Sequence, residues 1–203
     1  QRALQMQNEG AAIIDVGGES TRPGATPVAL EEELTRVIPV VGLLAQHLHI
    51  PICIDTQKPQ VMQAAVAAGA GMINDVNALQ APGAAEIALA CAVPVCIMHK
   101  QGEPASMQNH PSYADVVSEV FHFFQTRLAM LFEMGFSRKQ LLIDPGFGFG
   151  KTVQHNVLLL RNLARFKQFH VPILVGLSRK SMLAQLLQRE LEQRMAGSIA
   201  LAV

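Results

Sequence analysis

The chain has 203 residues, half of them hydrophobic and 16% charged, which suffices for one folded domain with a core and excludes an intrinsically disordered protein. Sixteen basic residues balance sixteen acidic ones, and this neutral balance disfavours a nucleic-acid or membrane-surface binder. The cysteines form no C-x-x-C pair, so we expect three buried, reduced thiols in a cytoplasmic protein: Cys53, Cys91 and Cys96.

Six short apolar runs, rich in Ile and Val, recur along the chain and do not alternate with polar residues. This pattern is typical of strands in a parallel sheet that is covered on both faces. Helical patterns separate the runs, so the chain alternates strand and helix, which indicates an α/β fold with right-handed crossovers. The predicted strands are 11–16, 51–56, 71–76, 94–99, 141–146 and 172–178.

Local signals predict where some of the intervening helices begin and end. Thr26 followed by Pro27 predicts a helix start. Gly69 and Gly135 predict two helix ends. The acidic run 31–33 predicts a solvated helix face.

Nearly every predicted strand ends in a polar residue. An open doubly wound sheet would spread these residues along an edge, whereas a closed barrel brings all strand ends to one mouth. We therefore predict a (β/α)8 TIM-type barrel. Both chain ends resemble parts of helices, so we expect residues 1–203 to form one barrel domain containing strands 2–7 and lacking the first and last strands. The polar strand ends are Asp15, Asp55, Asn74, His99, Asp144 and Ser178, with Lys180 just beyond.

Two of these carboxylates, Asp55 and Asp144, are predicted to face each other across the mouth with Asn74 between them. They could hold a metal, act as acid and base, or accept hydrogen bonds from a ligand rich in N–H groups. The third interpretation fits Asn74 and Lys180 best. A carboxylate accepts the adjacent N–H donors of an aminopyrimidinone, and an amide or ammonium meets its carbonyl oxygen.

Three neighbouring polar residues have structural alternatives. Asp15 could brace its own loop or take part in the site, and the sequence favours neither. Asp75 follows Asn74, so its side chain should point to the other face of the sheet, toward the helices. His99 is predicted to be a hydrogen-bonded residue at a strand end rather than a catalyst.

Two loops at the predicted mouth suggest anion contacts. In GLSRKS (176–181), Ser178 is predicted to cap the following helix, whose first backbone N–H groups would then bind an anion. ESTRPGA (19–25) offers the hydroxyl of Thr21 and the guanidinium of Arg22 to an anionic group.

A third loop, IDPGFGFGKT (143–152), resembles a phosphate-binding loop but has Pro145 where that motif requires Gly. We expect its glycines to turn the backbone over the mouth instead. Phe147 or Phe149 would lie against an aromatic ligand, and Lys151 would point outward.

Six motifs occur in order along almost the whole chain: IIDVGGESTRPGA, IDT-x-KP, INDV, MH, LLIDPGFGFGK and GLSRKS. Together they resemble the dihydropteroate synthase family of pterin-binding barrels. The resemblance implies a barrel enzyme that joins 6-hydroxymethyl-7,8-dihydropterin diphosphate to p-aminobenzoate and releases diphosphate, in folate biosynthesis. It also implies inhibition by sulfonamides, which mimic the aminobenzoate.

The resemblance implies roles for individual residues. It implies that these residues catalyse the reaction by positioning the substrates rather than by transferring protons. Departure of diphosphate and attack by a neutral arylamine need little acid–base chemistry. The implied pterin contacts are Asp55, Asn74, Met98, Asp144, Gly176 and Lys180. The implied diphosphate contacts are Thr21 and Arg22, the implied aminobenzoate contacts are Pro23, Phe149, Arg179 and Ser181, and Asp15 is a supporting residue.

Some parts of the family's site fall outside this chain. An Asn on the family's first strand binds Mg²⁺ and diphosphate, and an Arg and a His on its last strand grip the diphosphate. We therefore expect Mg²⁺ to enter with the substrate diphosphate, no metal ligand within this chain, and no turnover by the isolated chain. The resemblance also implies a homodimer.

Two alternatives remain open. A pterin-binding methyltransferase barrel would share the carboxylates without the arylamine site, and a non-catalytic fragment would bind without turnover. The presence of ESTRPGA, GFGFGK and SRKS together favours the synthase.

Overall fold

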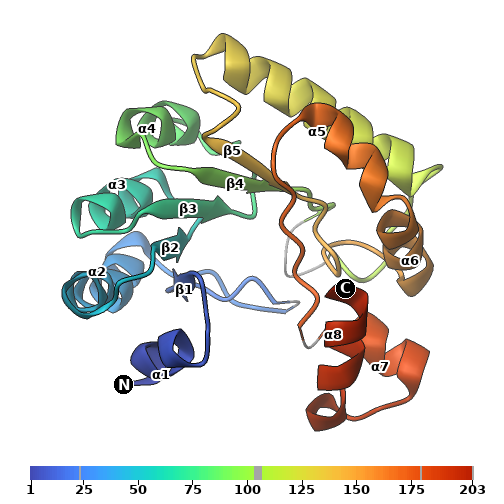
Figure 1. Ribbon diagram of the computed structural model, residues 1–203. Coiled ribbons are helices and arrows are strands. Elements are labelled where there is room, and N and C mark those ends of the chain that lie inside the picture. The colour runs from blue at the N-terminus through green and yellow to red at the C-terminus, as the bar shows by residue number, and fades with distance from the viewer. Residues whose placement is uncertain (23, 103–106, 179, 203) are drawn as a thin grey trace.

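A computed structural model describes residues 1–22, 24–102, 107–178 and 180–202 (Figure 1). Its centre is a parallel sheet of five strands, which lie in chain order. A doubly wound sheet reverses its strand order at a switch point, whereas a barrel adds each strand beside the last. The consecutive order therefore favours the barrel. The strands are β1 (Ile14–Gly17), β2 (Ile52–Asp55), β3 (Met72–Asp75), β4 (Val95–Met98) and β5 (Leu141–Asp144).

The sixth predicted strand pairs with β5 through a single bridge, between Ile143 and Ile173. Ile143 N donates to Pro172 O at 3.0 Å, and Leu174 N donates to Ile143 O at 2.9 Å. The next donor in a parallel ladder would be the backbone N–H of residue 145. Pro145 has no N–H, so the ladder stops there. The segment 172–178 thus lies beside β5 without forming a named strand.

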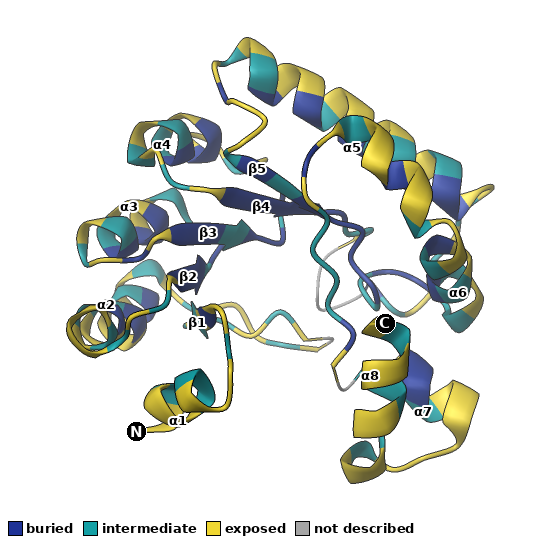
Figure 2. Ribbon diagram, viewed as in Figure 1, coloured by how far each residue is buried: buried dark blue, intermediate teal, exposed yellow. Residues whose placement is uncertain are grey.

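Helices cover the outer face of the sheet, with α2, α3 and α4 side by side along it (Figure 1). Figure 2 shows that their buried residues face the strands and their exposed residues face away. None of the described helices is long and apolar enough to cross a membrane. The α-helices are α1 (Arg2–Asn8), α2 (Leu30–His47), α3 (Pro59–Ala67), α4 (Ala84–Cys91), α5 (Val116–Glu133), α6 (Val153–Arg161), α7 (Ser181–Leu187) and α8 (Met195–Ala202). Two short 3-10 helices are η1 (Leu163–Phe169) and η2 (Leu191–Gln193).

The predicted helix ends are confirmed, but the predicted start at Thr26 is wrong. The helices α3 and α5 end just before Gly69 and Gly135, which have φ angles of +116° and +109°. The helix α2 begins at Leu30, with Ala29 rather than Thr26 as its N-cap. The reason is that Val28 N donates to the carboxylate of Glu19 at 3.3 Å, which keeps the residues before Ala29 in the loop after β1.

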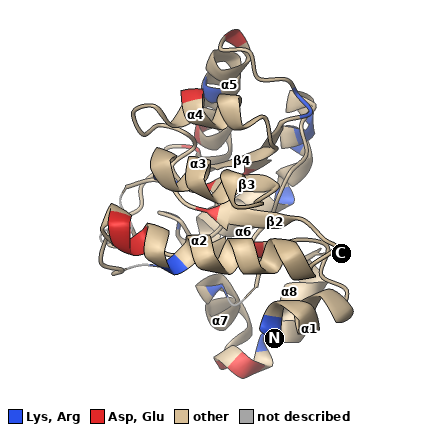
Figure 3. Ribbon diagram, turned by 90° about the vertical axis from the view of Figure 1, so that its left-hand side faces the viewer, with Lys and Arg blue, Asp and Glu red and all other residues tan. Residues whose placement is uncertain are grey.

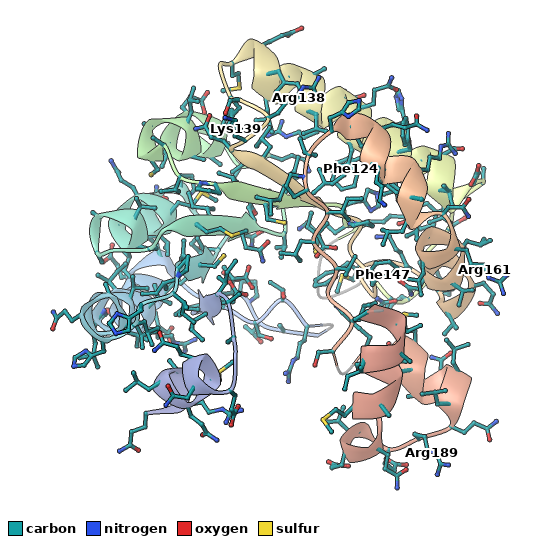
Figure 4. All side chains as sticks on the ribbon, in the orientation of Figure 1. Phe124, Arg138, Lys139, Phe147, Arg161 and Arg189 are labelled. Atoms are coloured by element: carbon teal, nitrogen blue, oxygen red, sulfur yellow. The ribbon has the colours of Figure 1, made fainter. Side chains whose placement is uncertain are left out.

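The main hydrophobic core lies between the sheet and its helices. Ile54 and Ile73 contribute from the strands, and Phe124 contributes from α5. Figure 4 shows Phe124 directed toward the sheet, whereas Arg161 of α6 points away from it.

A second, smaller cluster consists of Cys53, Met72 and Cys96, with the partly buried Leu142 and Leu174. We call it the inner cluster. Side chains alternate between the two faces of a strand, so the inner cluster lies on the face opposite the helices. All three cysteines are free, but Cys91 is only half-buried, so the expectation of a buried thiol is wrong there.

Candidate active site

The polar strand ends share the inner face of the sheet. Asp55, Asn74, Met98 and Asp144 each stand two residues beyond a member of the inner cluster, which places them on the same face. In the sheet register, Asp55 pairs with Asn74, and Met98 pairs with Asp144. The predicted pterin contacts on β2 to β5 are therefore brought together above the inner cluster.

Two of these side chains carry buried oxygen atoms with no hydrogen-bond partner among the described residues: Asp55 Oδ1 and Asn74 Oδ1. Burial, together with the nearby carboxylates of Asp15, Asp75 and Glu33, raises the pKa of Asp55 to about 7, against the opposing hydrogen bond from Asn74. Buried acceptors without donors are costly. The two neighbouring oxygens therefore form a place for a ligand that supplies N–H groups.

Asp144 is buried at the end of β5, and its Oδ1 accepts a hydrogen bond from Gly146 N at 2.8 Å. Burial raises the pKa of Asp144, while the Gly146 N–H and the charges of Lys180 and Lys151 act in the opposite direction. One carboxylate oxygen thus holds the following loop.

Lys180 lies above the aromatic ring of Phe149, with Nζ 4.7 Å from the ring centroid. Gly176 lies against this lysine: a Cβ atom there would lie 3.7 Å from Lys180 Cε and 3.8 Å from Nζ, which is ordinary van der Waals contact. Burial lowers the pKa of Lys180, and the Asp144 carboxylate opposes that change. Lys180, Gly176 and Phe149 form one wall of the mouth.

A cleft of about 590 Å³ lies at this wall. It is lined by Thr21, Arg22, Met107, Gln108, Gly148, Phe149, Ser178, Lys180, Ser181 and Leu191. The cleft thus brings together both predicted diphosphate contacts and two of the predicted aminobenzoate contacts. The other two, Pro23 and Arg179, lie outside the described residues. A larger groove, of about 750 Å³, runs along α5 and contains no predicted site residue.

The prediction that Ser178 caps the helix after it is wrong. The helix α7 begins at Ser181, its N-cap residue is Lys180, and no side chain caps it. The first helical N–H group is therefore that of Ser181, which lines the cleft. Ser178 also lines the cleft, at the end of the segment 172–178, which lies beside β5.

The glycines of the loop 145–151 turn the backbone as predicted, and they also allow a close approach. Gly146, Gly148 and Gly150 have φ angles of +72°, +82° and +64°, in the region that favours glycine. A Cβ atom on Gly146 would overlap His99 O, and one on Gly150 would overlap the backbone of Gln101. The loop therefore packs directly on the chain that follows β4.

The expectation that Lys151 points outward is wrong, because its side chain is buried under this loop. Its Nζ lies 2.9 Å from His99 Nδ1 and donates to the carbonyl oxygens of Gly146 and Phe149, each at 3.0 Å, and of His99 at 3.3 Å. Burial lowers the pKa of Lys151 to about 7. Lys151 thus ties the backbone of the glycine-rich turn to His99 from below.

The structural interpretation of His99 agrees with its surroundings. His99 is buried, its backbone N–H donates to Asp144 O at 3.0 Å, and its ring packs edge-on against Phe123. Burial and the neighbouring Lys151 lower the pKa of His99 to about 3.

The two phenylalanines of the loop have different environments. Phe147 is 1% exposed and belongs to the main core, where Figure 4 shows it inside the fold. Only Phe149 lines the cleft.

Asp75 and Asp15 occupy different environments. Asp75 is buried and accepts hydrogen bonds from Asn77 N and Leu79 N, each at 2.7 Å, so it braces the turn after β3. Asp15 is exposed on the edge strand β1, in register with Cys53. Its charge raises the pKa of Asp55, which makes it an electrostatic neighbour of the site.

The acidic start of α2 (Figure 3) is only partly solvated. Glu33 is fully buried, so the expectation of a solvated face is wrong at that residue. Its Oε1 accepts a hydrogen bond from Thr56 Oγ1 at 2.7 Å, and its Oε2 accepts one from Lys58 Nζ. Lys58 also pairs with Glu19. The sequence contained a signal for the burial of Glu33. Glu33 lies four residues before the buried Val37, and this spacing puts both residues on the inward side of α2.

Comparison with known proteins agrees with this geometry. The family model described as "Pterin binding enzyme" matches residues 1–203. The chain belongs to the pterin-binding enzyme family. Within that family it is similar to dihydropteroate synthases. It is 52% identical to that of Escherichia coli over 203 residues, covering the whole chain and 72% of the relative. It is 48% identical to that of Haemophilus influenzae over 196 residues, covering 97% of this chain and 71% of the relative.

Solved structures show the same fold. The Yersinia pestis dihydropteroate synthase with a sulfonamide drug complex matches with a TM-score of 0.96 and 48% identity, covering the whole chain and 74% of that structure. The Xanthomonas albilineans dihydropteroate synthase with 4-aminobenzoic acid matches with a TM-score of 0.93 and 51% identity, covering 98% of this chain and 71% of that structure. The predicted α/β barrel class is confirmed.

Proposed function

We propose that this chain carries the pterin and arylamine sites of a dihydropteroate synthase. It is a transferase that condenses 6-hydroxymethyl-7,8-dihydropterin diphosphate with p-aminobenzoate, giving 7,8-dihydropteroate and diphosphate in folate biosynthesis. The observation that carries the proposal is the pair of buried, unpartnered acceptors on Asp55 and Asn74 at the mouth that also contains the cleft. Xanthomonas albilineans dihydropteroate synthase has been solved with 4-aminobenzoic acid and with 7,8-dihydropteroate, which supports the same ligands here.

The pterin lies above the inner cluster in this proposal. The carboxylates of Asp55 and Asp144 accept the N–H groups of its aminopyrimidinone edge, and Asn74 and Lys180 meet its remaining polar atoms. Met98, which is 3% exposed, provides an apolar wall. Gly176 lies against Lys180 on the same side of the pterin.

The arylamine and the diphosphate lie in the cleft. Phe149 packs on the benzene ring, and the N–H of Ser181 receives the carboxylate. Thr21 and Arg22, which line the same cleft, contact the diphosphate. Pro23 and Arg179 are assigned to the arylamine side by the family resemblance alone.

The reaction needs one bond to break and one to form. The bond between the pterin methylene carbon and the diphosphate oxygen breaks, and the oxygen keeps the electron pair. The amine nitrogen of p-aminobenzoate bonds to the methylene carbon and then loses a proton to solvent. The residues of the mouth hold the two reactants in line, so positioning and electrostatics supply the catalysis.

Mg²⁺ enters this proposal only with the substrate diphosphate. Among the described residues, no group of three or more His, Cys, Asp or Glu side chains is placed to hold a metal ion. That this chain supplies no metal ligand stays an expectation from the family resemblance, and no step of the reaction is assigned to the metal.

The proposal also includes the assembly and the location of the protein. From the family resemblance we expect a single pterin-binding barrel domain, and we expect the protein to form a homodimer. A cytoplasmic location is supported by the buried free thiols of Cys53 and Cys96.

Diphosphate release measured with the whole protein tests the function. We expect release only when pterin diphosphate and p-aminobenzoate are both present, with 7,8-dihydropteroate detected by mass spectrometry and competition by a sulfonamide. Methyl transfer from methyltetrahydrofolate without diphosphate release would favour the methyltransferase alternative.

A further inference from the structure

A cluster of charged side chains outside the ligand contacts connects three elements beside the mouth. Lys58 is the N-cap residue of α3, Glu33 lies in the first turn of α2, and Glu19 follows β1. Lys58 Nζ forms ion pairs with the Oε2 atoms of both glutamates. We call these three residues the Lys58 clamp.

We propose that Lys58 is a positioning residue for the synthase reaction, which holds the loop after β1 in its substrate-binding position through Glu19 and Glu33. This inference rests on the proposed function. Lys58 is a positioning residue rather than a catalytic one, because its ammonium is engaged by two carboxylates.

The burial of the clamp distinguishes it from ordinary surface ion pairs. The side chain of Glu33 is 0% exposed, that of Glu19 is 13% exposed and that of Lys58 is 22% exposed. Exposed pairs contribute little, whereas removing one partner from a buried pair leaves an uncompensated charge. Without Lys58, the carboxylates of Glu19 and Glu33 would repel each other across the clamp.

Each glutamate also holds backbone or side-chain groups of the site. Glu19 Oε1 accepts from Val28 N at 3.3 Å, so Glu19 ties together the two ends of the loop that carries Thr21. Glu33 Oε1 accepts from Thr56 Oγ1 at 2.7 Å, next to Asp55 at the end of β2. The clamp therefore joins the loop to the strand end that supplies a proposed pterin contact.

The two sides joined by the clamp face each other across a small cavity. Glu19, Ser20 and Thr21 line it from the loop, and Asp55 and Thr56 line it from the end of β2. Thr21 also lines the larger cleft. The distance between the proposed diphosphate contact and the proposed pterin contact is thus set by the clamp.

Lys58→Met in the whole protein tests this assignment. A misplaced loop should weaken contact to the diphosphate end, so we expect kcat/KM for pterin diphosphate to fall on the order of ten- to a hundredfold. Calorimetric binding of a pterin analogue without diphosphate should change less than threefold, because Asp55, Asn74 and Asp144 remain. Lys58→Arg keeps the charge and should recover most of the activity.

Glu19→Gln and Glu31→Gln form a matched pair, in which the first variant tests the clamp and the second is its control. Glu19→Gln weakens the clamp at the loop, outside the core, and should reproduce the loss in kcat/KM in a folded protein. Glu31 is exposed in the same first turn of α2, two residues before Glu33, so Glu31→Gln should leave the kinetics unchanged. A folded Lys58→Met protein with the parent's kinetic constants would overturn the proposal.

Hydrogen exchange of the loop amides gives a readout that does not depend on turnover. Lys58→Met should speed exchange at least tenfold in residues 19–22 and 24–28, relative to the helix α5 in the same protein. If the parent protein releases no diphosphate, the proposed function fails, while faster exchange would still support the clamp. Unchanged exchange together with uniform loss across all kinetic constants would leave only a general structural role and overturn the positioning proposal.

Discussion

Asp144 divides its carboxylate between the protein and the proposed ligand. Its Oδ1 accepts from Gly146 N, and an asparagine could accept the same bond, so Asp144→Asn should fold normally. The new amide group would place a donor against the N–H edge of the pterin. We expect a loss of about 2–4 kcal/mol in the binding free energy of a pterin analogue, measured by calorimetry. Unchanged affinity in a folded Asp144→Asn protein would remove Asp144 from the site.

Asp55 should make pterin binding depend on pH. Its pKa is raised to about 7 by burial and neighbouring carboxylates. Only the ionised carboxylate accepts two N–H bonds, so affinity should fall as the pH drops through 7, roughly tenfold between pH 8 and pH 6. The same titration with Asp55→Asn should show weaker binding and no such fall. A parent protein whose affinity stays level across this range would contradict the assignment.

Phe149 should matter more to the arylamine than to the pterin. Phe149→Ala removes the ring proposed to pack on p-aminobenzoate, at a cost of about 1 kcal/mol or more in arylamine and sulfonamide affinity. The effect on pterin affinity should be smaller, because Phe149 acts on the pterin only through Lys180. The Nζ atom of Lys180 lies 4.7 Å from the centroid of the Phe149 ring. If pterin affinity falls while the KM for p-aminobenzoate is unchanged, Phe149 contacts the pterin and the assignment to the arylamine is wrong.

At the scale of elements, the loop 145–151 is shaped by close packing as well as by turning. Gly146→Ala would combine the strain of a positive φ with an overlap between Cβ and His99 O. Gly148→Ala has the same backbone strain, but its nearest contact is Lys180 Cδ at 3.5 Å.

We expect Gly148→Ala to lower the free energy of unfolding by about 1 kcal/mol and Gly146→Ala to lower it by at least about 2 kcal/mol more, measured by urea denaturation. Gly42→Ala in α2 has open space and an ordinary φ, so it should be neutral or slightly stabilising. Equal losses at Gly146 and Gly148 would show that the overlap relaxes without cost.

The sequence predicted the elements and strand-end residues better than the buried polar contacts between them. Apolar runs identify β1 to β5, and alternation along β3 separates Asn74 from Asp75, because these signals are local. Lys151 and Glu33 were both expected in solvent. Their partners, His99 and Lys58, are distant in sequence, and no local pattern indicates such pairing.

Two predictions of helix starts were wrong for a related reason. Thr26 and Ser178 have the side chains of N-caps, but α2 and α7 begin later. At α2 the boundary is set by Glu19, which binds Val28 N from the far side of the loop. A tertiary contact therefore overrides the local capping signal.

At the scale of the whole molecule, the consecutive order of parallel strands explains why one mouth can serve two ligands. Each strand brings its carboxyl end beside that of the previous strand, above the inner cluster of Cys53, Met72 and Cys96. The polar ends of β2 to β5 form the proposed pterin side, and the loops after β1 and β5 and the start of α7 line the cleft. The fold thus places the two proposed sites side by side.

A crystal structure of the protein with a pterin analogue and a sulfonamide tests this arrangement most directly. The account predicts the N–H edge of the pterin within about 2.7–3.2 Å of oxygen atoms of Asp55, Asn74 and Asp144, with the sulfonamide ring against Phe149. A pterin bound in the groove along α5, with Asp55 Oδ1 and Asn74 Oδ1 still unpaired, would contradict it.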